Sequence, residues 1–180
     1  MLEIEVPGTE IWDSENEIFY YTGSSKLVLE HSLISISKWE SKWNKPFLSK
    51  DEKTPEEMID YVKCMIVNRA DPIVCNCLTT DNYKQINDYI AAPMTATTFR
   101  ENGGAPRGNR EIMTSEVIYF YMISFGIPFE CEKWHINRLL TLIRVCSIKN
   151  SPSKKMSKSA AAKQQRALNA QRRAKAHSKG

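Results

Sequence analysis

Residues 24–47, SSKLVLEHSLISISKWESKWNKPF, change their pattern part of the way along. Residues 26–30 form a short run of mostly β-prone side chains, whereas from Ser32 onward Leu33, Ile36, Trp39 and Trp43 recur at three- and four-residue spacing. A short β-prone run favours a β-strand, and the three- and four-residue spacing places Leu33, Ile36, Trp39 and Trp43 on one face of a helix. We therefore expect the fold to change from strand to helix near residue 31.

The residues before this segment extend the β pattern. Residues 2–6 and 17–21 are further β-prone runs, and the breakers Pro7-Gly8 and Gly23-Ser24-Ser25 separate the runs from one another. Such short runs between turn residues are typical of antiparallel strands. The sequence predicts a small antiparallel sheet or meander within residues 1–31.

The residues after it predict more helices. Thr54-Pro55-Glu56-Glu57 has the composition of a capping box and begins a helix to about residue 68. Thr80 or Asp81 is expected to cap a further helix that runs through residue 90, and two more helices are expected over 111–125 and over 129–148. Residues 93–111 are expected to form a long exposed loop. The body, residues 1–150, is thus predicted to be α+β and mainly α, with residues 32–150 supplying about five helices.

The end of the chain has a different charge. Nine of the 25 Lys and Arg lie in residues 151–180, where there is no Asp or Glu, which leaves 16 basic residues against 21 carboxylates in residues 1–150. The body is therefore acidic and the tail is basic, with a linker expected at 150–153. Residues 159–176 are rich in Ala, Gln, Lys and Arg, so we expect a tail that is flexible or marginally helical alone and that forms a stable helix on a partner.

No pattern in the sequence indicates a cofactor, a membrane span or catalysis. The longest apolar stretch, residues 117–129, is too short to cross a bilayer, and the first ten residues lack the features of a secretory signal. The five cysteines are expected to be reduced, and Cys131 with His135 would give a metal only two ligands on one helical face. We expect a soluble, cytoplasmic protein that is not an enzyme.

A resemblance covers most of the chain. Residues 24–47, 52–65 (EKTPEEMIDYVKCM), 92–99 (APMTATTF) and 127–150 (IPFECEKWHINRLLTLIRVCSIKN) resemble proteins encoded in the tail gene clusters of long-tailed bacteriophages. That group is associated with tail assembly chaperones, which hold the tape measure protein while tail tube subunits polymerise around it. The resemblance implies these two partners and the host cytoplasm as the place of action. It also implies that the basic end is either the region before a ribosomal frameshift or a segment that docks on a client.

The residues expected to bind partners fall into two groups. Exposed aromatic side chains in a groove of the body would receive a client helix, and the basic tail would contact acidic surfaces. These residues are Phe47, Tyr121, Phe125, Lys154, Lys155, Lys158, Lys163, Arg166, Arg172 and Arg173. Three alternatives stay open: a nucleic-acid-binding protein that uses the tail, a virion component of the neck or tail end, and a tail that only keeps the protein in solution.

Overall fold

The structure is a computed structural model that describes residues 1–13, 17–99, 112–151 and 158–176. The chain divides into two compact units, Met1–Ser147 and Ile148–Gly180. The first contains antiparallel strands followed by helices, and the fold is a mainly helical α+β fold, as the sequence predicts.

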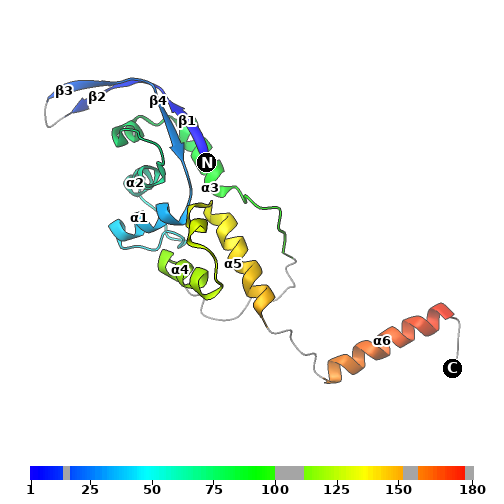
Figure 1. Ribbon diagram of the computed structural model, residues 1–180. Helices are drawn as coiled ribbons and strands as arrows, with labels where there is room; N and C mark the ends of the chain where they lie inside the picture. The colour runs from blue at the N-terminus through cyan, green and yellow to red at the C-terminus, as the bar shows by residue number, and fades with distance from the viewer. Residues whose placement is uncertain (14–16, 100–111, 152–157, 177–180) are drawn as a thin grey trace. The chain divides into compact units, whose positions relative to one another are not determined.

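The strands form two antiparallel pairs. Strand β1 (Leu2–Val6) pairs with β4 (Ser25–Leu29), and β2 (Thr9–Asp13) pairs with β3 (Ile18–Thr22). Figure 1 shows the second pair continuing beyond the first. The sequence did not indicate β2, and it placed the other strands within one residue of their observed positions.

Gly8 lies at the junction between the two strand pairs. A Cβ atom at this position would lie 2.6 Å from the carbonyl oxygen of Thr22, which is too close for any other residue. Beside it, Thr22 Oγ1 donates to the carbonyl oxygen of Thr9 at 3.0 Å and closes the start of the β2–β3 hairpin. A close backbone approach therefore explains one of the predicted breaks.

The first three α-helices begin at side-chain caps. Ser32 caps α1 (Leu33–Trp43), and Thr54 with Glu57 forms the predicted capping box of α2 (Pro55–Met65). Helix α3 (Thr80–Ala91) begins one residue earlier than expected, because Thr79, not Thr80 or Asp81, accepts the hydrogen bond from Asn82 N. A 3₁₀ turn, η1 (Pro72–Cys77), lies between α2 and α3.

The last two helices of the body differ from their predicted bounds. Helix α4 spans Ser115–Ser124, with Thr114 as its N-cap, so it starts later than the expected residue 111. The single helix expected over 129–148 is wrong: a 3₁₀ turn, η2 (Phe129–Lys133), precedes α5 (Ile136–Asn150). His135 forms a β-bridge with Ser32 and Ile136 N donates to His31 O at 2.7 Å, so the backbone there bonds to another segment instead of continuing a helix.

The core lies where the β1–β4 pair meets the helices. Val6, Leu27 and Leu29 come from the strands, and they belong to one buried cluster with side chains from α1, α2, α3, α4 and α5. The largest fully buried helical members are Leu33, Ile36, Trp39, Tyr61, Met65, Ile86, Ile118, Met122, Ile136 and Leu139. The hydrophobic effect of this cluster fixes the positions of α1, α4 and α5, which carry the surfaces considered next.

The second unit contains the helix α6 (Lys158–Ala176), which agrees closely with the helical stretch expected in the tail. In the parts of the chain that the structure describes, no helix has both the length and the apolar character to span a bilayer. The expected linker at 150–153 and the loop residues 100–111 fall largely outside the described residues.

Candidate functional site

Phe47, expected to be exposed, is buried with only 7% of its surface accessible. Its ring stacks on Tyr61 with ring centroids 3.9 Å apart and meets Trp39 edge-on at 5.1 Å. The expectation of an exposed ring is therefore wrong, because the chain after α1 folds back over the α1–α2 contact. Phe47 stabilises the core and presents no surface to a partner.

The carboxylate of Glu40 holds this loop in place. Its Oε1 accepts from Phe47 N at 2.8 Å, and its Oε2 accepts from Ser115 N at 2.7 Å, within a buried environment. One side chain thus fixes both the loop after α1 and the first turn of α4. Sequence spacing placed Glu40 on a helix but gave no sign of these two distant donors.

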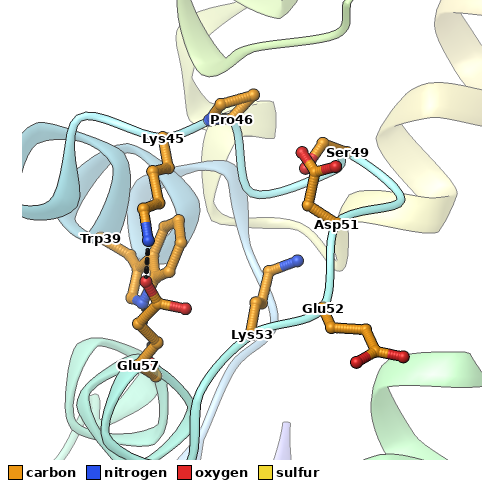
Figure 2. Close-up of a pocket in the computed structure, with 8 residues that line it drawn as sticks. All are labelled: Trp39, Lys45, Pro46, Ser49, Asp51, Glu52, Lys53 and Glu57. Carbon is orange, nitrogen blue, oxygen red and sulfur yellow. Dashed lines mark hydrogen bonds and ion pairs between the residues drawn. The ribbon is translucent and has the colours of Figure 1, made fainter.

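A pocket of about 250 Å³ lies beside this loop (Figure 2). Lys45 reaches across to pair with Glu57, and this hydrogen bond, together with one from Thr54 N, lowers the pKa of the Glu57 carboxyl. Lys53 Nζ lies 4.8 Å from the centre of the Phe47 ring, a cation–π distance. Lys45 and Lys53 therefore already contact a carboxylate and an aromatic ring of the same chain. These two contacts stabilise the packing of the segment after α1 against the start of α2.

Helix α4 has apolar side chains all round, with Glu116 as its one charged residue. A helix of this kind is normally buried on every side. Here Ile118 and Met122 face the core, yet Phe120 is 63% exposed and Ile123 is 65% exposed. We call the outward side of α4 that carries Phe120 and Ile123 the α4 outer face.

Tyr121 and Phe125, the two expected contact residues on this helix, lie at its margin. They are half-buried, they pack against the core, and their rings stack with centroids 6.2 Å apart. Phe120 contacts Tyr121 at 5.6 Å, so the predicted pair borders the α4 outer face and supports it. The sequence reasoning found the aromatic run but missed Phe120 and Ile123, because a helix that is apolar all round gives no signal of its outward side.

The expected basic residues are distributed along α6. Lys163, Arg166, Arg172 and Arg173 are exposed there, and Lys158 is its first residue. Lys154 and Lys155 lie outside the described residues. Since α6 contains six Lys and Arg and no Asp or Glu, it is a helix of one charge sign.

A buried polar cluster joins residues that the sequence placed on separate elements. The rings of His31 and His135 lie 5.0 Å apart, and His31 Nδ1 hydrogen-bonds the Tyr61 hydroxyl. Tyr89 donates to Glu30 Oε1 at 2.6 Å. We call these five residues the histidine cluster.

Both imidazoles of the histidine cluster are held in the neutral form. Burial lowers the pKa of His31 to about 3, with the charge of His135 adding to the effect, and burial also lowers the pKa of His135. His135 Nε2 lies 3.0 Å from Tyr89 O, and its Nδ1 accepts from Asn137 N at 3.3 Å. Both ring nitrogens of His135 are therefore engaged away from Cys131, and the helical face that was expected to carry both residues does not exist.

The five cysteines are free thiols. Within the described ranges, no group of three or more His, Cys, Asp and Glu side chains could hold a metal ion.

Comparisons with known proteins add no relative: no family model, no curated protein and no solved structure matches the chain.

Proposed function

We propose that this protein is a non-enzymatic tail assembly chaperone of a long-tailed bacteriophage, which acts in the host cytoplasm and binds the tape measure protein or the tail tube protein. The observation that carries the proposal is the exposure of Phe120 and Ile123 on a helix that is apolar all round. Exposed apolar side chains that gather on one face are a common feature of protein-binding surfaces. The resemblance of residues 24–47 and 127–150 to tail-cluster proteins supplies the class of client.

The arrangement of α4 fits a helical client. Phe120 and Ile123 are three residues apart and so lie on one side of the helix, with Tyr121 and Phe125 at the margin. A client helix with apolar residues at three- and four-residue spacing would cover both exposed side chains. The buried side of α4 keeps its position because Ile118 and Met122 are fully enclosed.

Capture of the tape measure protein tests this proposal. The full chain is co-expressed with the tape measure protein of the same phage, and the amount of tape measure protein that it captures is measured. The Kd of the complex is then measured for the parent protein and for the double variant Phe120→Ala/Ile123→Ala. We expect Kd to rise about tenfold or more, because truncating two central apolar contacts removes on the order of 1 kcal/mol or more each.

The control is Val67→Ala, which shortens an exposed apolar side chain away from α4 and should leave Kd unchanged. Absence of capture by the parent protein, or equal capture by the double variant, would contradict the proposal. Repeating the capture experiment with the tail tube protein shows which of the two proteins is the client.

Helix α6 supports a second candidate, a protein that binds nucleic acid. Six basic residues and no acidic residue on one helix form the electrostatic pattern that phosphate backbones attract. This function predicts steep salt dependence of binding and no effect of Phe120→Ala/Ile123→Ala. The same double variant therefore separates the two functions.

A further inference from the structure

The β2–β3 hairpin carries an aromatic face that neither the core nor the α4 outer face uses. Trp12 is directly opposite Phe19, and Glu10 is directly opposite Tyr21, so these four side chains share one face of the hairpin. Trp12, Phe19 and Tyr21 are 50%, 68% and 73% exposed, and the Trp12 and Phe19 rings lie 4.7 Å apart. We call these four residues the hairpin face.

The hairpin also has unused backbone groups. In the part of the chain that the structure describes, its sheet consists of β2 and β3 alone, so the outer edge of β3 pairs with no further strand. A two-stranded sheet is marginally stable in water, and an unpaired edge accepts an added strand. These properties favour a partner in an extended conformation.

The negative charge of the hairpin favours a partner that carries positive charge. Glu10 is exposed on the hairpin face, Glu17 is exposed just before β3, and neither β2 nor β3 contains Lys or Arg. Aromatic rings attract Lys and Arg side chains through cation–π interactions, and carboxylates attract the same groups. The negative charge also opposes nucleic acid at this surface, because its phosphates carry the same sign.

A pocket of about 370 Å³ continues this surface at the base of the hairpin. Tyr21 belongs both to the hairpin face and to the wall of the pocket, and Ile73 lines it as well. Asp71, the one charged residue of the wall, accepts from Ile73 N at 3.0 Å through Oδ1. The pocket thus offers a carboxylate and an apolar wall within one continuous surface that begins at Tyr21.

We propose that the hairpin face and the adjoining pocket bind a basic polypeptide segment in an extended conformation. The segment pairs with the free edge of β3, lays Lys or Arg side chains across Phe19 and Tyr21, and directs one of them toward Asp71. This inference does not rest on the tail-assembly function, because it concerns a different surface from α4. It assigns the protein a second docking site for a partner of opposite charge to the hairpin.

The test uses the full chain and a fluorescein-labelled (Arg-Thr)₅ peptide, whose alternation places the arginines on one side of an extended strand. Fluorescence anisotropy gives Kd for the parent and for Phe19→Ala/Tyr21→Ala. We expect Kd to rise about tenfold, since the variant loses two cation–π contacts with the arginines. Phe129→Ala is the matched control, because it truncates an exposed aromatic side chain of η2 to which no binding role is assigned, and it should leave Kd unchanged.

A second variant covers the case in which the double substitution disturbs the hairpin itself. Glu10→Gln keeps the size of an exposed side chain and removes one charge from the hairpin face, and we expect Kd to rise about threefold as for one weakened surface ion pair. The proposal is overturned if the parent does not bind the peptide, if these variants bind it as the parent does, or if (Glu-Thr)₅ or single-stranded DNA binds with the same dependence on Phe19 and Tyr21.

Discussion

Replacing Glu40 with alanine is expected to lower the free energy of unfolding by about 3–6 kcal/mol, because two N–H donors lose a carboxylate partner at about 1.5–3 kcal/mol each. The donors are Phe47 N and Ser115 N, at 2.8 and 2.7 Å from the two carboxylate oxygens. Both bonds lie in buried surroundings, so the loss of the acceptor leaves two N–H groups without their partner. Urea denaturation followed by tryptophan fluorescence measures the change.

Two comparisons make this result specific. Glu40→Gln retains one acceptor oxygen but turns an amide donor toward the other N–H, so we expect an intermediate loss of stability. Glu52→Ala removes a carboxylate from the exposed rim of the pocket in Figure 2 and should change the free energy of unfolding by less than about 0.5 kcal/mol. Equal stability of Glu40→Ala and Glu52→Ala would show that the Glu40 contacts do not hold the fold together.

Acid should destabilise the protein through the histidine cluster. His31 is neutral in the folded state with a pKa of about 3, whereas an imidazole in the unfolded chain has a pKa of about 6.5. Between these two values the unfolded state binds more protons, so stability falls as pH falls from about 6.5 towards 3. For His31 alone we expect a loss of about 2.5 kcal/mol between pH 7 and pH 4.5.

The groups around His31 explain why its imidazole stays unprotonated in the folded protein. Its neighbours are the Tyr61 hydroxyl, the Phe47 ring and the imidazole of His135, whose own pKa is lowered by burial. Glu30 accepts from Tyr89 and pairs with the amino group of Met1 at 3.1 Å. A positive charge on the His31 imidazole would therefore be buried without a direct counter-charge, with the ring of His135 5.0 Å away.

The pH dependence is checked by urea denaturation at pH 7, 6, 5 and 4.5 on the parent and on His31→Gln. The substitution keeps a polar group beside Tyr61 and removes the titrating ring, so the variant should lose less stability on acidification than the parent. Identical slopes for the two proteins would mean that His31 is not responsible.

The sequence was a good guide where local chemistry decides the structure. The capping box at Thr54 and Glu57 and the strand at residues 2–6 follow from neighbouring residues alone, and both are confirmed. The sequence was a poor guide where contacts between residues far apart in the chain determine the structure. The helix expected over 129–148 is interrupted because His135 and Ile136 bond to the segment at His31 and Ser32, about a hundred residues away in the chain.

The same limit applies to the candidate contact surfaces. Phe47 was expected to be exposed in a groove of the body, but the loop that Glu40 holds packs its ring on Tyr61 and buries it. Strand β2 went unnoticed because TEIWD carries two acidic residues, and only its pairing with β3 reveals the hairpin face. Side chains that act across large sequence separations leave little trace in local periodicity.

The central proposal is that the protein acts during tail assembly and is not retained afterwards. The most direct measurement is a quantitative immunoblot, with an antibody raised against the protein, of phage-producing cells and of purified particles. A chaperone predicts a clear signal in the cells and none in the particles. A fixed number of copies in every particle would contradict the proposal and would make the protein a structural component of the virion.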